Sequence, residues 1–509
     1  MKSGGNMAKL KVLFVYPNLF MMNLVPPAIG LLSALLRGEG YEVDVFDTTY
    51  YQSEGAFDSD KKKEENLQVR PFNLEEKGIH GKNTDMYADF RERVRSFQPD
   101  LLAMSAVEDV WGLGSRLLAQ VRQYNVPVIV GGVFATFAPN VVIQDPSVDI
   151  VCVGEGEVPL LELCRKLTTG EDYSRIANLW VKRPDGTVVK SAMQTRVDIS
   201  TLPMPDYSLF EDKRFYRPMA GRVYRMLPIE THRGCPYSCQ FCNSPSQQTL
   251  YRFNKAGSYF RKKNIAKVHA EMTGLIKAWN LEYVYFTADT FLAWSEREFD
   301  EFIEMYADFK LPFWIQTRVE TIEDEKMKKL KEVGIHRMSI GLEHGNEKYR
   351  KEVLKRNVTN EEIIRAFKIA EHHDIPVTVN NITGFPDETR ALAQSTIEIN
   401  AQIKTDTTNC YAFTPFHGTP LRELSIRRGY MKEDAITQCL TGEPVLEMPN
   451  FPKEQIKGLM RTMPMYAKFP RDVWPRIARA ERFDAEGNAV FEGLRKEYVA
   501  RFFTGESVS

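Results

Sequence analysis

The order of apolar and polar positions along the chain predicts two successive strand–helix series. In the first series, short apolar runs at residues 11–16, 41–46, 100–105, 126–132 and 150–153 predict buried strands. Between the first two runs, Ile29, Leu32 and Leu36 recur at helical spacing, and Gly38 follows them. Because strand–helix–strand units of this length build parallel sheets, we expect an open α/β sheet here.

A second series begins at residue 226. Strands are expected at 226–230, 283–286, 313–317, 337–341, 377–382 and 409–414, and amphipathic helices near 264–279, 295–310, 323–333, 360–373 and 388–402. Six such units predict a partial (β/α)6, TIM-like barrel rather than a closed eightfold one. In such barrels the chemistry takes place at the carboxyl ends of the strands.

The remaining segments set the expected domain limits. Residues 50–90 are polar and are interpreted as a solvated insertion, and residues 171–225 as a bridge with a hairpin at Pro184-Asp185-Gly186. Beyond residue 428 the pattern indicates a small helical cap. The expected fold class is therefore α/β, with a Rossmann-like sheet (1–170), a bridge (171–225), a partial barrel (226–428) and a helical C-terminal region (429–509).

Composition narrows the class of protein. The 509 residues include 67 basic and 68 acidic side chains, so no overall charge attracts the chain to nucleic acid. No window approaches the ~20 continuous apolar residues of a membrane span. The seven cysteines are odd in number, and three of them lie in one loop. This argues against a disulfide framework and favours a reducing compartment, so a cytoplasmic location is expected.

The three grouped cysteines carry the strongest chemical signal. Cys235, Cys239 and Cys242 have the spacing C-x3-C-x2-C and follow the strand expected at 226–230. Thiolates are the soft ligands of iron–sulfur clusters. Three cysteines leave one iron of a cubane open to a non-protein ligand. Two alternatives remain: a zinc knuckle, with His232 as the nearest fourth ligand, and a disulfide with a spare thiol.

This motif, with Phe241 directly before the last cysteine, resembles the signature of the radical S-adenosylmethionine enzymes. The resemblance implies a [4Fe–4S] cluster on the three cysteines and S-adenosylmethionine on the open iron. Other residues at the expected strand ends are similar to the family's S-adenosylmethionine contacts. They are Asp289, Arg318, Glu343, Ile382, Gly384 and Phe413, together with Phe241 itself. The motif residues span roughly 226–428.

Residues 10–170 resemble the cobalamin-binding domain that precedes many enzymes of this family. The resemblance rests on Pro17-Asn18, Gly131-Gly132 and the turn Gly154-Glu155-Gly156. It implies cobalamin contacts at the strand ends, namely Asn18, Ser105, Val107, Gly131, Gly132, Gly154 and Glu155. The chain lacks the Asp-x-His-x-x-Gly motif, so we expect no histidine ligand to cobalt. The loop 107–111 is then expected to face the lower side of the metal.

Together these resemblances imply a cobalamin-dependent radical S-adenosylmethionine methyltransferase acting on an unactivated carbon or phosphorus of a small molecule. A one-electron donor of the flavodoxin or ferredoxin type is the expected partner. A cyclase, oxidase or rearrangement enzyme that transfers no methyl group shares every motif and remains the first alternative. A non-catalytic metal-binding module is the second. The sequence does not reveal the substrate or the oligomeric state.

Overall fold

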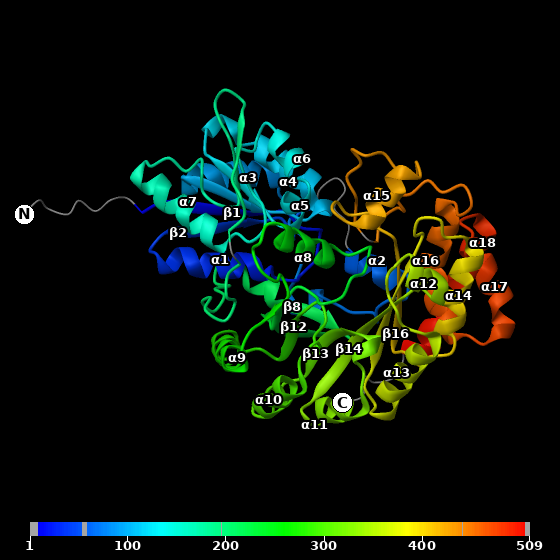
Figure 1. Ribbon diagram of the computed structural model, residues 1–509. Helices are drawn as coiled ribbons and strands as arrows, with labels where there is room; N and C mark the ends of the chain where they lie inside the picture. Colours follow the sequence, from blue (N-terminus) through cyan, green and yellow to red (C-terminus); the bar gives the residue numbers. More distant parts are fainter. Residues whose placement is uncertain (1–8, 53–58, 195, 440, 504–509) are drawn as a thin grey trace, which may run out of the picture. The chain divides into compact units, whose positions relative to one another are not determined.

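The computed structural model describes residues 9–52, 59–194, 196–439 and 441–503, and the chain forms two compact units (Figure 1). The N-terminal unit comprises Met1–Ala56, His80–Arg214 and Gln247–Tyr259. The barrel unit comprises Phe57–Ile79, Phe215–Ser246 and Phe260–Ser509. The chain thus passes between the units several times, and residues 57–79, which interrupt the first strand–helix series, belong to the barrel unit.

The N-terminal unit contains a seven-stranded sheet in the order β2-β1-β3-β4-β5-β6-β7. Its strands are β1 (Lys11–Tyr16), β2 (Glu42–Asp47), β3 (Leu101–Ser105), β4 (Val128–Gly131), β5 (Ile150–Cys152), β6 (Leu179–Lys182) and β7 (Val188–Lys190). The first five strands are parallel, which confirms the expected open α/β sheet. The hairpin expected within residues 171–225 is β6–β7, and it extends this sheet antiparallel to β5.

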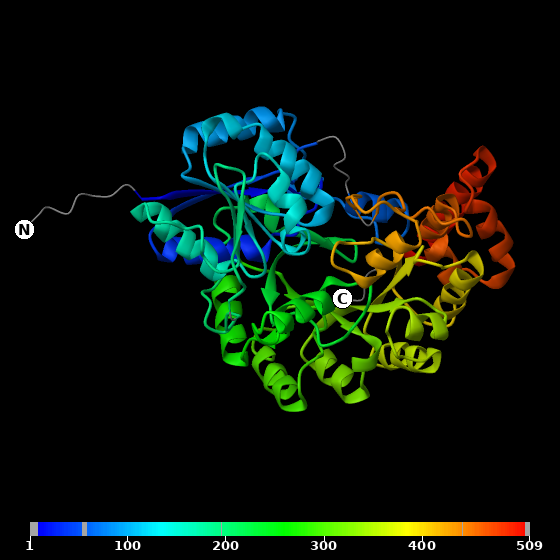
Figure 2. The same ribbon diagram turned by 45° about the horizontal axis from the view of Figure 1, so that its top comes forward.

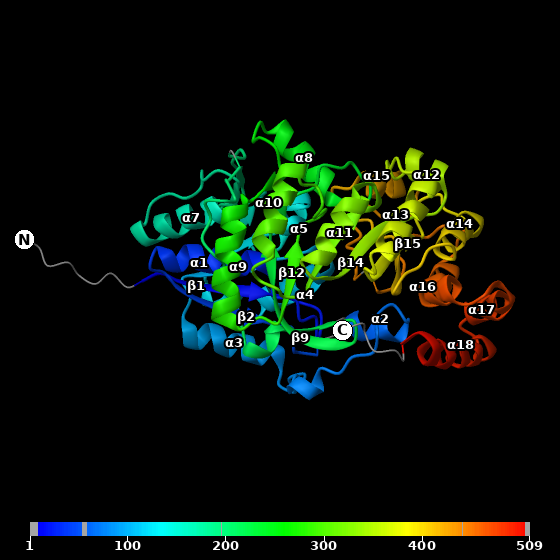
Figure 3. The same cartoon turned by 90° about the horizontal axis from the view of Figure 1, so that it is seen from below.

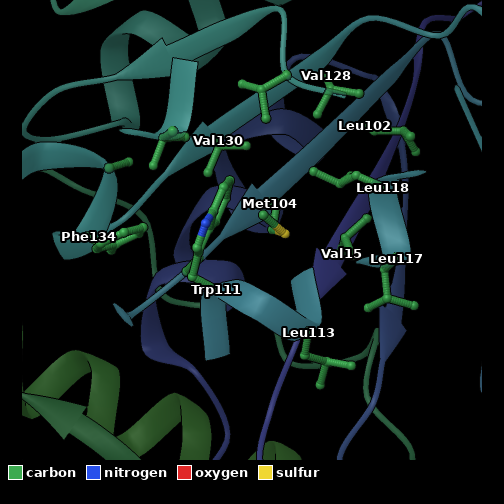
Figure 4. Packing of buried hydrophobic residues seen from close by; sticks show 14 of the residues in the cluster. Val15, Leu102, Met104, Trp111, Leu113, Leu117, Leu118, Val128, Val130 and Phe134 are labelled. Carbon is green, nitrogen blue, oxygen red and sulfur yellow. The ribbon is translucent and has the colours of Figure 1, made fainter. Parts of the chain in front are cut away.

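Helices connect the strands of this unit. They are α1 (Pro27–Gly38), α3 (Met86–Phe97), α4 (Trp111–Ala119), α5 (Val133–Phe137), α6 (Pro139–Gln144) and α7 (Glu157–Thr169). Figure 4 shows Trp111 and Phe134 beside Met104 of β3, and the two aromatic ring centroids lie 5.5 Å apart. A Cβ atom on Gly114 would lie 2.7 Å from the sulfur of Met104, so glycine allows α4 to approach β3 closely.

The barrel unit contains a second seven-stranded sheet, in the order β16-β15-β14-β13-β12-β9-β8. Its strands are β8 (Tyr216–Met219), β9 (Arg222–Glu230), β12 (Tyr283–Thr287), β13 (Phe313–Arg318), β14 (Ile335–Glu343), β15 (Val377–Thr383) and β16 (Thr407–Ala412). The six strands from β9 to β16 are parallel, and β8 pairs antiparallel with β9. The expected six-unit partial barrel is confirmed, and its two edge strands are β8 and β16.

Helices lie along the outer side of this sheet (Figures 2 and 3). They are α9 (Ile265–Trp279), α10 (Glu296–Tyr306), α11 (Asp324–Glu332), α13 (Asn360–His372) and α14 (Arg390–Asn400). Local sequence explains where two of them begin, because Ser295 and Thr359 each form a capping box with the glutamate three residues later. Shorter elements complete this part: β10 (His232–Arg233), β11 (Arg261–Lys262), α8 (Asn243–Phe253) and α12 (Glu347–Glu352).

The two faces of the barrel sheet differ in chemistry. On the outer face Phe286 of β12 contacts Phe302 of α10, with ring centroids 5.4 Å apart. On the inner face, which points away from these helices, Tyr285 stacks on Trp314 of β13 at 4.3 Å. Further along the inner face, the Asn409 side chain of β16 donates to Asn380 of β15 at 2.9 Å. Because alternate residues of a strand point to opposite sides, one face is apolar core and the other polar and aromatic.

Residues 59–79 form a strap between the two edge strands of the barrel sheet. The strap contains α2 (Ser59–Glu65) and a 3-10 turn at Glu75–Lys77. The Gln68 amide donates to the carbonyl of Cys410 in β16 and to that of Met460. At the other edge the Lys77 ammonium lies 5.6 Å from the ring centroid of Tyr216 in β8. The interpretation of this segment as a solvated insertion was wrong, because side-chain contacts 300 and more residues away order it.

The C-terminal region is helical, as expected, and its helices pack against the last strand, β16. They are α15 (Pro420–Arg427), α16 (Lys453–Lys468), α17 (Trp474–Ala480) and α18 (Ala485–Tyr498). Leu459, Met463 and Tyr466 of α16 are buried in one core with residues of β16. Among the described residues, no helix is long and apolar enough to cross a membrane.

A buried ion triad joins the strap to the barrel. Arg70 donates to Asp406 at 2.7 Å, and Arg337 at the start of β14 donates to the other oxygen of the same carboxylate. Burial alone would raise the pKa of Asp406, but Arg337 and Arg70 lower it to about 2. The folded state therefore favours the charged carboxylate, and this contribution to stability is present above pH ~4 and lost as the pH falls toward 2.

We predict that Asp406→Asn lowers the free energy of unfolding of the apoprotein by about 2–3 kcal/mol at pH 7, and by about half as much near pH 3. Urea unfolding at the two pH values measures the difference. Asp300→Asn is the control, because Asp300 pairs with Lys329 at the solvent-exposed surface and should have little effect. Equal losses at pH 7 and pH 3 in Asp406→Asn would contradict the assigned role of the charge.

Candidate active site

The cysteine loop connects β10 to α8 and lies at the carboxyl end of β9. Gly234 begins it with a φ of +85°, a conformation that favours glycine. The backbone of Gln240 anchors its centre, because its N–H donates to Leu354 O and its carbonyl accepts from Leu421 N–H, each at 3.2 Å. All three cysteines of the loop are free thiols. The loop is thereby tied to the segments that follow α12 and β16.

Each cysteine sulfur of the loop contacts a different neighbour. Cys235 Sγ lies 3.3 Å from Thr290 Oγ1, and Cys242 Sγ accepts the backbone N–H of Ser244 at 3.4 Å. Cys239 Sγ accepts a hydrogen bond from Arg318 Nη1 at 2.8 Å. Burial raises the pKa of Cys242 to about 12 and also raises the pKa of Cys235. These two thiols therefore need a metal to become thiolates at neutral pH.

The donor set fits the cluster that the resemblance implies, because three thiols stand in one short loop at a strand end. His232, the fourth ligand that a zinc site would use, is 3% exposed, and its ring centroid lies 4.1 Å from that of Trp294. Its Nδ1 contacts Thr231 Oγ1 at 2.9 Å, and its buried Nε2 has no hydrogen-bond partner among the described residues.

Arg318, at the end of β13, links the cysteine loop to an acidic neighbour. Besides Cys239, its guanidinium donates to Glu320 and lies 3.8 Å from the ring centroid of Tyr237. Burial opposes its charge, but Cys239 and Glu320 raise the pKa of Arg318 overall. A contact of Arg318 with S-adenosylmethionine stays a prediction, and in this structure the guanidinium contacts the sulfur of Cys239.

Two acidic residues stand at neighbouring strand ends. Asp289 follows β12 and is exposed, yet partial desolvation raises its pKa, while Ser244 lowers it. Glu343 ends β14 with a φ of 68°, an uncommon conformation for a residue with a side chain. Arg356 donates to Glu343 Oε1 at 3.2 Å and to Gly341 O at 2.7 Å. Burial raises the pKa of Glu343 despite this arginine.

Glu388, which the sequence analysis did not single out, links the ends of β14 and β15. Its carboxylate accepts the N–H groups of Gly384 and Phe385 at 2.6 and 3.0 Å. His344 Nε2 donates to the same carboxylate at 3.2 Å, and His344 Nδ1 accepts the N–H of Asn346. His344 is fully buried. Ile382, at the centre of the same segment, is half-buried.

Aromatic contacts connect the cysteine loop with the last two strands. The ring centroid of Phe241 lies 5.8 Å from that of Phe385, which lies 5.2 Å from that of Phe413. Gly384 has a φ of +81°, and a Cβ there would lie 2.8 Å from Ile456 of α16. The structure therefore brings Phe241, Gly384 and Phe413 to one edge of the barrel unit. Arg356 and Glu388 were missed because nothing in their local sequence marks them; only their partners do.

In the N-terminal unit, the predicted cobalamin residues do lie at the carboxyl edge of the sheet. Ser105 and Gly131 are paired neighbours on β3 and β4, and Val107 just beyond β3 is 46% exposed. Gly132 has a φ of +103°, and a Cβ there would lie 2.5 Å from the carbonyl oxygen of Ala106. Glycine at this position therefore allows the turn after β4 to pack closely on the backbone that follows β3.

Other predicted residues of this edge are occupied by internal bonds. The Asn18 amide donates to Met22 O and Thr49 Oγ1, both at 2.8 Å. Glu155 accepts the backbone N–H of Val197 through its carboxylate, and the N–H of Gly154 donates to Thr136. These side chains shape the turns. Burial raises the pKa of Asp109, in the 107–111 loop, to about 6. The single histidine of this unit, His80, is exposed.

Comparisons with known proteins agree with this geometry. Residues 229–398 match the radical SAM superfamily, and residues 73–164 match the B12 binding domain. An uncharacterised methyltransferase of Pyrococcus horikoshii is 27% identical over 416 residues, which cover 80% of this chain and 86% of that protein. The anaerobic magnesium-protoporphyrin IX monomethyl ester cyclase of Rubrivivax gelatinosus is 26% identical over 64% of this chain and 58% of its own length.

A solved structure shares the whole fold. The radical S-adenosylmethionine methyltransferase TsrM from Kitasatospora setae, with cobalamin and a [4Fe–4S] cluster bound, superposes with a TM-score of 0.65 at 16% identity. The match covers 97% of this chain and 100% of TsrM. The two matched domains imply a [4Fe–4S] cluster, S-adenosylmethionine and cobalamin as cofactors, and an enzyme rather than a non-catalytic binding module. The chain therefore contains a radical SAM domain at residues 229–398 and a B12 binding domain at residues 73–164.

Proposed function

We propose that this enzyme transfers a methyl group to an unactivated carbon or phosphorus centre of a small molecule. The observation that carries the proposal is the three-cysteine loop at the carboxyl edge of the barrel unit, in a chain that also has a B12-binding domain. The similarity to a methyltransferase over most of both chains supports the same reaction class. A flavodoxin- or ferredoxin-type protein would supply the electron.

The barrel residues have distinct proposed roles. Cys235, Cys239 and Cys242 hold the cluster, and Arg318 stabilises the thiolate of Cys239. Asp289 and Glu343 bind the polar groups of S-adenosylmethionine, Asp289 as an acceptor for its ammonium group. Phe241, Ile382, Gly384 and Phe413 line its adenine end. When bound, the cofactors together supply two things: a deoxyadenosyl radical, which removes hydrogen, and a methyl group, which is carried on cobalt.

The N-terminal unit has the proposed role of holding cobalamin without a protein imidazole. At its strand edge Val107 is 46% exposed and Gly131 partly exposed, and the described residues 105–111 and 131–132 include no histidine. The nearby loop 107–111 would face the lower side of the cobalt. The one histidine of the unit, His80, lies outside this edge, in the segment that follows the strap.

A second candidate function is radical cyclisation without methyl transfer. The similarity to the magnesium-protoporphyrin IX monomethyl ester cyclase of Rubrivivax gelatinosus favours it, since that relative matches 64% of this chain. The residues of the barrel site are equally compatible with both reactions, because both begin with hydrogen removal by the same radical. Product stoichiometry separates them.

The proposed cluster predicts the effect of removing its ligands. Changing Cys235, Cys239 or Cys242 to Ala should abolish both the iron–sulfur absorbance of the anaerobically reconstituted protein and the formation of 5′-deoxyadenosine. Cys410→Ala is the matched control, because Cys410 is buried in β16 on the outer face and should leave both signals intact. Stoichiometric zinc without iron in the wild-type protein would refute the cluster.

The second prediction concerns S-adenosylmethionine. Loss of one charge-assisted hydrogen bond costs about 1.5–3 kcal/mol, so Asp289→Ala and Glu343→Ala should each weaken its binding roughly ten- to hundredfold. Equilibrium binding to the reconstituted protein measures the change. Glu347→Ala is the control, because Glu347 lies four residues after Glu343, in the first turn of α12; this variant should bind S-adenosylmethionine like the wild type. Wild-type affinity in both site variants would mean that other residues bind the ligand.

The third prediction separates the two reactions. A methylase of this kind uses one S-adenosylmethionine to methylate cobalt and another to form the radical, so S-adenosylhomocysteine and 5′-deoxyadenosine should appear in near-equal amounts. The product should gain one methyl mass. Quantitative chromatography of the reaction mixture gives the ratio. Deoxyadenosine released without matching S-adenosylhomocysteine would instead identify the cyclase or oxidase chemistry.

A further inference from the structure

The inner face of the barrel sheet carries buried polar atoms that the protein itself does not satisfy. Within the described part of the chain, Arg217 Nη1 of β8, Thr287 Oγ1 of β12 and Asn409 Oδ1 of β16 have no hydrogen-bond partner. Strand registers place all three on the inner face. Buried polar atoms without partners are rare in folded proteins, so a face that gathers three of them is built to meet a ligand or water.

Two cations of this face share one carboxylate. Lys63 of α2 in the strap lies 3.2 Å from Asp60 Oδ1, and Arg217 of β8 acts on the same carboxylate electrostatically. Only 19% of the Lys63 side chain is exposed. Tyr411 of β16, next to Lys63, is neutral because burial raises its pKa. Among the described side chains, Asp60 is the carboxylate that both cations share, so the two cations carry one charge more than this carboxylate and favour a further anion.

An aromatic stack holds the guanidinium in place. The guanidinium carbon of Arg217 lies 4.6 Å from the ring centroid of Tyr285, and that ring stacks on Trp314 with an interplanar angle of 10°. The indole N–H of Trp314 donates to Ser339 at 3.2 Å, which fixes the stack on the sheet. The stack therefore orients Arg217. Its Nη1 can bind an acceptor with little further loss of side-chain conformational entropy.

We propose that Lys63 and Arg217 bind an anionic group of the substrate, a carboxylate or a phosphate, on the inner face of the barrel unit. This inference rests on the proposed function, because it assumes that the substrate enters this face. Arginine and lysine together match the oxygens of either group. Asp60 orients the two cations and offsets one of their two charges, so an anionic group of one charge completes the balance.

The placement also orders the substrate along the strands. Tyr285, which supports Arg217, lies two residues before Thr287 at the carboxyl end of β12, a distance of roughly 7 Å. The cysteine loop lies at that carboxyl edge. If Lys63 and Arg217 hold the anionic group, the substrate atom that meets the radical lies at least ~7 Å from that group. The strap selects the substrate because it supplies one of the two cations.

The test uses full-length, anaerobically reconstituted protein and two probes, inorganic phosphate and malonate. Isothermal titration calorimetry should detect binding of at least one probe to wild-type protein. Lys63→Met and Arg217→Met should each weaken that binding tenfold or more. Lys62→Met is the matched control, because Lys62 is exposed on the same helix and pairs with Glu65, and it should bind like wild type. The probe that binds more tightly distinguishes phosphate from carboxylate.

Two outcomes would overturn the inference: binding of neither probe by wild-type protein, or wild-type affinity in Lys63→Met and Arg217→Met. Should Arg217→Met lose its cluster absorbance through misfolding, Arg217→Lys and Lys63→Met keep the test decisive, since the first restores a charge and the second changes a partly exposed helix residue. Formation of 5′-deoxyadenosine by the wild-type protein tests the proposed function separately. Deoxyadenosine formed without anion binding would refute this inference alone.

Discussion

Six parallel strands of the barrel unit end at one edge of a curled sheet, and the arrangement of the active site depends on this constraint. A side chain at the end of any of these strands meets side chains that are distant in sequence. Cys239 and Arg318 are 79 residues apart, yet the ends of β9 and β13 bring their polar atoms within 2.8 Å. The site is therefore rigid without being locally encoded, because each residue is held by the strand that precedes it.

A partial barrel, unlike a closed one, leaves two edge strands with unpaired backbone groups. The strap and α16 together cover one of these edges, that of β16. The Gln68 amide donates both to a carbonyl of β16 and to a carbonyl of α16, and the triad of Arg70, Asp406 and Arg337 ties the strap to the amino ends of the strands. An insertion into the first strand–helix series has thus become part of the second.

Buried charge is distributed unevenly over the inner face, and this distribution connects architecture with specificity. Near the cysteine loop, Arg318 and Arg356 are matched by Glu320 and Glu343. Toward the other end of the strands, Lys63 and Arg217 share one carboxylate among the described residues, that of Asp60. A charge matched within the protein supports structure, whereas an unmatched one is available to a ligand. The same face can therefore hold a reactive edge and, deeper along the strands, a recognition site.

Local pattern was sufficient for the secondary structure and for the cluster ligands. Alternating and continuous apolar runs located all eleven parallel strands of the two sheets, because strand burial follows the period of the side chains. The spacing of Cys235, Cys239 and Cys242 indicated a cluster, because a short loop keeps its own ligands together. Only the tertiary structure could show that residues 59–79 complete the barrel, that Glu388 organises two strand ends and that Arg318 contacts a cysteine. Those contacts join residues 44 to 392 positions apart, and no local periodicity records a partner at such a distance.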